Sequence, residues 1–88
     1  MHAVIVDVSI NDVEQAQREL RERTVPAVSQ APGFVSGYWI DHGEGRGHSV
    51  VVFETEEQAT AMADRVRSNA PEAVAIENVG VHEVVAHA

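Results

Sequence analysis

The fold is decided by residues 34–41, FVSGYWID, which are followed by the glycine-rich residues 43–47, GEGRG, and then by residues 50–53, VVVF. The two flanking segments are rich in β-branched and aromatic residues, which favour strands. The glycines between them supply turn conformations. The stretch therefore predicts a β-hairpin.

A strand and a helix are expected before this hairpin. Residues 2–9 alternate, with Val4, Val6 and Val8 on one side and Asp7 on the other, which is the period of a strand with two different faces.

Apolar residues then recur near helical spacing, and the capping pair of this helix is either Asn11 with Glu14 or Asp12 with Gln15. Pro26 lacks an N–H, so the helix is expected to kink or restart there before it stops at an Ala-Pro-Gly sequence, residues 31–33.

A second helix and a last strand are expected after the hairpin. Thr55 and Gln58 form a capping box, and apolar residues follow at i, i+3, i+4 and i+7 until the helix ends near residues 69–71. The final segment, residues 74–86, is dominated by Val and Ile, and its length allows a bulge at Gly80.

These elements follow the order βαββαβ, which predicts an α+β, ferredoxin-like fold in a single domain, residues 1–88. In this fold four antiparallel strands form one sheet and two helices cover one of its faces. The strands carry apolar side chains on both sides, so the uncovered face is expected to pack on the sheet of a second copy. The sequence thus predicts a homodimer.

The composition of the chain indicates which kinds of partner it can bind. A chain of 88 residues without cysteine has a small core and no disulfide to support it, which also favours a dimer. Six arginines against fourteen acidic residues give a net charge of −8, which argues against nucleic acid and anionic membranes as partners. The start of the chain has no basic segment followed by a long apolar run, so we expect a cytoplasmic protein.

The segments described above resemble the dimeric α/β-barrel superfamily, and within it the antibiotic-biosynthesis-monooxygenase-like domains. The resemblance covers nearly the whole chain, and its most specific piece is Pro32-Gly33-Phe34 followed by a strand. It implies a homodimer whose two sheets pack into a barrel. Members of the superfamily include cofactor-independent oxygenases, haem-degrading enzymes, isomerases and proteins without a known activity.

The haem-degrading branch carries an Asn in the first strand, a Trp near the end of the third strand and a His on the second helix as iron ligand. The comparable positions of this chain hold Val4 or Val6 and Phe53, and residues 55–69 contain no His. The comparison with this branch argues against haem, and no cofactor is predicted.

Five residues are predicted to line a ligand site between sheet and helices: Trp39, Phe53, Val4, Val6 and Met62. Trp39 is the leading candidate, because an indole can stack on a planar aromatic ligand; packing in the core or in the dimer interface is the alternative.

The candidates for proton transfer are Tyr38 and His48, and His2 is a further histidine that strand alternation could aim at a cavity. Because adjacent strand residues face opposite ways, Tyr38 and Trp39 cannot line the same pocket. The residues Asp41, His42, Glu44 and His48 gather near the hairpin, but no helix sets their spacing, and no metal site is predicted.

Three functions remain open from the sequence. The first is a homodimeric domain that binds a small apolar or aromatic molecule. The second is a cofactor-independent monooxygenase or isomerase for an aromatic or polyketide-like substrate, which would need a cavity of roughly 300 Å³ or more. The third is a protein-interaction module that uses a free sheet edge. Whether the protein is an enzyme is not decided by these patterns.

Overall fold

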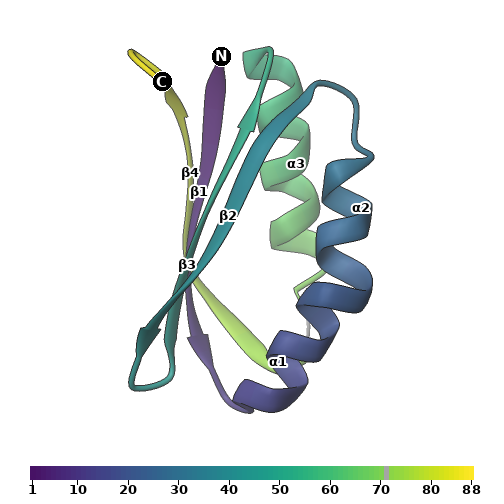
Figure 1. Ribbon diagram of the computed structural model, residues 1–88, viewed down its shortest axis with the longest axis vertical. Coiled ribbons are helices and arrows are strands. Elements are labelled where there is room, and N and C mark those ends of the chain that lie inside the picture. The colour runs from purple at the N-terminus through teal and green to yellow at the C-terminus, as the bar shows by residue number, and fades with distance from the viewer. Residues whose placement is uncertain (71) are drawn as a thin grey trace.

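The computed structural model describes residues 1–70 and 72–88. The elements are β1 (His2–Ile10), α1 (Val13–Glu19), the π-helical turn η1 (Leu20–Thr24), α2 (Val25–Ser29), β2 (Phe34–Gly43), β3 (Arg46–Phe53), α3 (Glu56–Ser68) and β4 (Val74–Glu83). The sheet has the order β2-β3-β1-β4, and every neighbouring pair is antiparallel. The helices cover one face and leave the other open (Figure 1). The predicted ferredoxin-like fold is confirmed.

The hairpin turn is tighter than predicted. Strand β2 continues to Gly43 and β3 begins at Arg46, so only Glu44 and Gly45 form the turn. Both turn residues have positive φ, 57° and 73°, which explains the glycine-rich sequence at this point. The N–H of Gly43 donates to the Asp41 carboxylate at 2.7 Å, which holds the end of β2 against the turn.

The elements α1, η1 and α2 follow one another without a break and are called here the first helical segment. It begins at the second of the two predicted caps, where the Asp12 side chain accepts a hydrogen bond from the N–H of Gln15 at 3.1 Å. The chain stays helical through Pro26, where a kink or restart was predicted. Pro26 has no N–H and cannot make the regular helical hydrogen bond. The π-helical turn η1 lies directly before it, and there the N–H of Val25 bonds to the carbonyl of Leu20, five residues earlier. The helix ends at Ser29, slightly earlier than predicted.

Helix α3 begins with the predicted capping box. Thr55 accepts from the N–H of Gln58 at 3.2 Å, and the Gln58 side chain accepts from the N–H of Thr55 at 3.1 Å. Gly33, with φ 79°, lies directly against the Gln58 side chain, and its carbonyl accepts from the N–H of Glu54 at 2.9 Å. The Pro-Gly-Phe sequence before β2 therefore contacts the start of α3. Helix α3 ends at Ser68, and Pro71 of the predicted stop lies outside the described residues.

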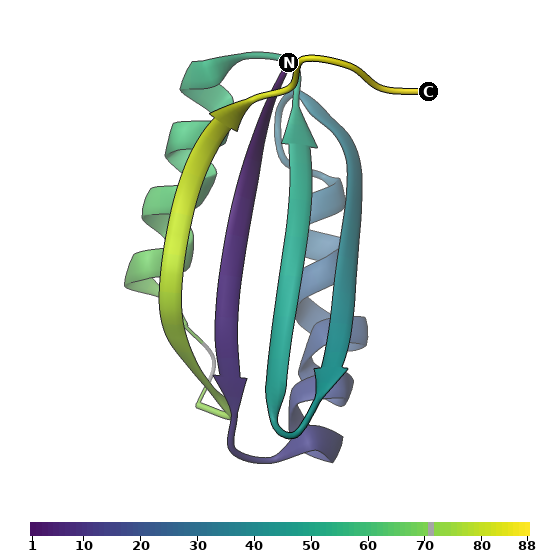
Figure 2. The ribbon, with the colours of Figure 1, turned by 90° about the vertical axis from the view of Figure 1, so that its left-hand side faces the viewer.

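Strand β4 differs from the prediction in length and in the position of its bulge. It ends at Glu83, and the bulge is at Glu77, because Asp7 pairs with Asn78 while Val8 pairs with Ile76. The prediction of a bulge at Gly80 was wrong. Gly80 pairs in register, and its missing side chain leaves room for the His82 ring, whose Nε2 would lie 2.7 Å from a Cβ there. Residues 84–88 then lead away across the end of the sheet (Figure 2).

The core lies between the sheet and α3. Its buried members are Val4, Val6, Val51, Phe53, Ala59, Met62 and Ala63. Helix α3 contributes three of them, whereas α1, η1 and α2 bury no residue fully. The first helical segment therefore covers the sheet less closely than α3 does. Within the described residues no helix has the length and apolar character needed to cross a membrane.

Candidate ligand-binding site

A cavity of about 450 Å³ lies between the sheet and the helical layer. The cavity lies where the facing side chains are small and leave space unfilled. These residues are Gly47 and Ser49 on the helix-facing side of β3, and Ala16 and Ala27 on the first helical segment. Further along β3 the same side carries Val51 and Phe53, and there the space is filled. The volume exceeds the roughly 300 Å³ that a small-molecule site requires.

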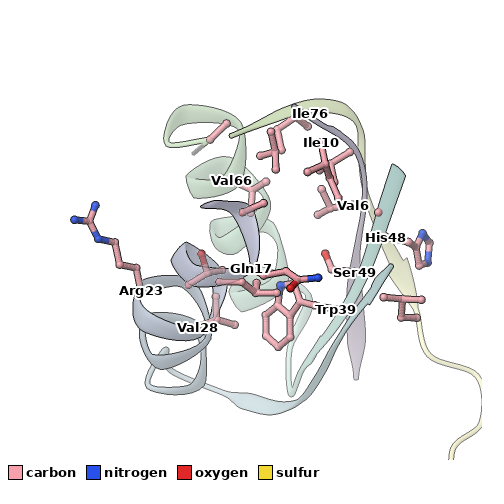
Figure 3. A pocket seen from close by; sticks show the side chains of 18 of the residues that line it. Val6, Ile10, Gln17, Arg23, Val28, Trp39, His48, Ser49, Val66 and Ile76 are labelled. Atoms are coloured by element: carbon pink, nitrogen blue, oxygen red, sulfur yellow. The ribbon is translucent and has the colours of Figure 1, made fainter. Parts of the chain in front are cut away.

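The walls of the cavity are mainly apolar and come from several elements. Strand β1 contributes Val6 and Ile10, α2 contributes Val28, α3 contributes Val66 and β4 contributes Ile76 (Figure 3). Such a lining favours a ligand that is itself mostly apolar.

Trp39 forms the wall on the β2 side, and its indole is positioned by a glycine that the sequence analysis did not single out. A Cβ on Gly37 would lie 2.9 Å from Cη2 and 3.0 Å from Cζ3 of Trp39. Because Gly37 has no side chain, the ring can lie along the strand, where it also contacts the core. The spacing Gly-x-Trp, two residues apart on one strand face, is the signal that could have identified this pair.

Two polar side chains point into the cavity from opposite layers. Gln17 extends from α1 across the cavity toward Trp39 and Ser49 (Figure 3). Among the described residues, no side chain or backbone group hydrogen-bonds to the side chains of Gln17, Ser49 or Trp39. Gln17 follows Val13 by four positions and so shares the inward stripe of the helix, a signal visible in the sequence.

The predicted ligand contacts divide into two groups. Val6, Trp39 and Met62 line the cavity, whereas Val4 and Phe53 do not. Val4 and Phe53 are each 1% exposed and lie where α3 approaches the sheet closely. They fill the core and leave no surface for a ligand.

The candidates for proton transfer lie outside the cavity. Tyr38 is 64% exposed on the open face of the sheet, opposite to Trp39. The ring of His48 points away from the cavity, although its backbone borders it (Figure 3). His2 faces the start of α3, with Nε2 3.7 Å from the Glu56 carboxylate and Nδ1 buried without a partner among the described residues.

His48 instead forms a polar cluster on the open face. Its Nδ1 lies 2.7 Å from Oδ1 of Asp7, and its ring meets the ring of His42 edge-to-face, with centroids 5.5 Å apart. The hydrogen bond from His48 lowers the pKa of Asp7 below its ordinary value of 3.8. Desolvation is the second-largest effect on this pKa and opposes the lowering, whereas the electrostatic attraction of His48 and His42 and the hydrogen bond with Asn78 add smaller contributions that lower it.

This cluster predicts a component of acid sensitivity. Because the pKa of Asp7 is lowered on folding, its contribution to stability is present above its ordinary pKa of 3.8 and is lost as the pH falls through the lower folded pKa. We expect the free energy of unfolding of the natural chain to fall more steeply below about pH 4 than that of Asp7→Asn. Urea titrations at stepped pH measure this, and equal slopes for the two proteins would contradict it.

No three His, Asp or Glu side chains converge on a common point within residues 1–70 and 72–88 in a way that could hold a metal ion.

No protein-family model matches the chain, and a search of curated proteins finds no match. Solved structures do match. A mutant of MhuD with two manganese protoporphyrin IX molecules per active site is 21% identical with a TM-score of 0.62, over 100% of this chain and 98% of that one. The haem degrader MhuD from Mycobacterium tuberculosis, with two haems in its active site, is 24% identical with a TM-score of 0.57, over 97% and 98% of the two chains.

A haem-free, cleaved form of the Mycobacterium tuberculosis protein is 26% identical with a TM-score of 0.53, over 100% of this chain and 99% of that one. The three matches extend over essentially the whole of both chains, so the likeness concerns the complete fold. At the level of fold, the resemblance to the dimeric α/β-barrel superfamily is confirmed.

Proposed function

We propose that this protein binds a small, planar and largely apolar molecule between its sheet and its first helical segment. The observation that carries the proposal is the cavity of about 450 Å³, with apolar walls and the indole of Trp39 on one side. An indole at the wall of an apolar cavity favours a flat aromatic ligand, which can pack against it. The structurally similar MhuD, which binds haem in its active site, supports a small-molecule role for this fold.

Haem itself does not fit the residues of this cavity. Haem iron takes an axial ligand from His, Cys, Met or Tyr. No Cys or Tyr lines the described cavity, the ring of His48 points away from it, and α3 contains no His. Met62 is only 5% exposed because its side chain belongs to the core. The proposed ligand is therefore metal-free.

The same cavity supports a second candidate function, a cofactor-independent monooxygenase or isomerase acting on an aromatic substrate. Trp39 at the wall favours it, since the indole would hold the substrate plane. The two predicted proton-transfer residues, Tyr38 and His48, lie outside the cavity and supply no acid or base to it. Binding is therefore the function that the geometry supports best.

We also propose that two copies pack through their open sheet faces. Cross-strand pairing puts Tyr38, Ile40, Val50, Val52 and Ile5 on this face. Tyr38 and Ile40 are 64% and 46% exposed, and the other three are partly exposed. Covering this apolar surface with a second copy would supplement the small core of the single chain.

Binding is tested with N-phenyl-1-naphthylamine, a neutral aromatic probe that fluoresces in apolar surroundings. We expect the natural chain to bind it and Ala16→Phe to bind it at least about tenfold more weakly, because the added ring occupies the cavity. The matched control is Ala61→Phe, the same change at an exposed position of α3 outside the cavity. Failure of the natural chain to bind, or equal binding by both variants, would overturn the proposal.

A further inference from the structure

The inward face of the first helical segment is apolar except at a few positions. Val13, Ala16, Leu20 and Val28 line the cavity at helical spacing, and Gln17 lies among them. A glutamine in such a stripe places an amide where an apolar side chain would fill space and contact the sheet. Gln17 instead extends into the cavity (Figure 3).

Ser49 is a polar residue that faces the cavity from the sheet, as Gln17 does from the helices. Along the helix-facing side of β3 it stands between Gly47 and Val51, at the floor of the cavity and opposite Val6 of β1. Its hydroxyl has no hydrogen-bond partner in the part of the chain that the structure describes. An amide and a hydroxyl without protein partners thus face the same space from the helix and from the sheet.

The charged residues of the lining do not compete with these two groups. Arg23 points away from the cavity (Figure 3), and the Asp41 carboxylate accepts the N–H of Gly43. Arg65 and Gln17 are both exposed residues of the lining, and Gln17 is the one whose side chain extends into the cavity (Figure 3). The groups directed inward are neutral, so they match a neutral polar group on a ligand better than an ionised one.

We infer that Gln17 and Ser49 form a clamp for a neutral oxygen substituent, a hydroxyl or a carbonyl, on an aromatic ligand whose ring stacks on Trp39. The inference rests on the proposed function and names the ligand class of the same site. An amide and a hydroxyl each offer both a donor and an acceptor, so together they satisfy either kind of oxygen. Each bond replaces one that the ligand oxygen loses on leaving water.

The test compares naphthalene with 1-naphthol, which has the same rings and one hydroxyl, by displacement of N-phenyl-1-naphthylamine. An apolar cavity without polar partners would favour naphthalene, because the hydroxyl would be buried unpaired. We expect the natural chain to bind 1-naphthol at least about tenfold more tightly than naphthalene. In the double variant Gln17→Met with Ser49→Ala, this preference is expected to fall to about threefold or less.

The matched control is Gln30→Met, an exposed glutamine after α2 that does not line the cavity; it should keep the preference. Equal binding of naphthalene and 1-naphthol to the natural chain would overturn the clamp and leave the proposed binding function standing. So would a double variant that weakens both compounds equally. Absence of binding by all three aromatic compounds would overturn the proposed function and the clamp together.

Discussion

Replacing Phe53 with alanine is expected to lower the free energy of unfolding by about 3–5 kcal/mol, the range for removing a fully buried aromatic ring. Phe53 is 1% exposed, and its ring packs edge-to-face on that of Phe34, with centroids 6.3 Å apart and planes at 81°. A domain of this size has a total stability of only about 5–15 kcal/mol, so the variant should be close to unfolding. Urea denaturation followed by circular dichroism measures the change.

Two further variants make this result specific. Phe53→Leu removes less buried volume than Phe53→Ala and should therefore cost clearly less stability. Val85→Ala, at a side chain that is 90% exposed, should change the stability by less than about 0.5 kcal/mol. A loss for Phe53→Ala no larger than that for Phe53→Leu would show that this end of the domain is not the closely packed core described above.

Tyr38→Lys is expected to dissociate the proposed dimer. Tyr38 is 64% exposed on the open face, so the single chain should tolerate lysine there. In a sheet-to-sheet interface the ammonium group would be buried without a partner, at a cost of about 2 kcal/mol or more, which raises the dissociation constant at least about 30-fold. Sedimentation velocity over a dilution series measures this constant.

Ala61→Lys, an exposed position on α3 at the other face of the domain, is the control and should leave the dissociation constant unchanged. If the natural chain sediments as a monomer at all concentrations, or if Tyr38→Lys associates as the natural chain does, the open face is not the interface.

The space between the sheet and the helices is filled at one end and open at the other. At one end Ala59 and Ala63 let α3 approach the sheet, and Val4 and Phe53 fill the space between them. At the other end the inward positions of β3 are Gly47 and a serine, and the cavity remains. The packed end holds the sheet and α3 together, so the cavity can persist without collapse of the domain.

Part of the candidate site followed from local patterns and part did not. Strand alternation placed Tyr38 and Trp39 on opposite faces, and the structure has them there. The same alternation could not separate Val4, which is in the core, from Val6, which also borders the cavity, because both face the helices. Their difference depends on how far the helical layer stands from each point of the sheet.

By itself the sequence determined the order of the elements, the hairpin, the capping box of α3 and the ferredoxin-like fold, because these depend on periodicity and on turn and cap chemistry within a few residues. Only the tertiary structure decided where the cavity opens, which side chains line it, that Gly37 makes room for Trp39 and that the bulge of β4 falls at Glu77. These features arise from contacts between segments far apart in the chain. The distance between two layers is set by all the side chains between them, and no local pattern records that sum.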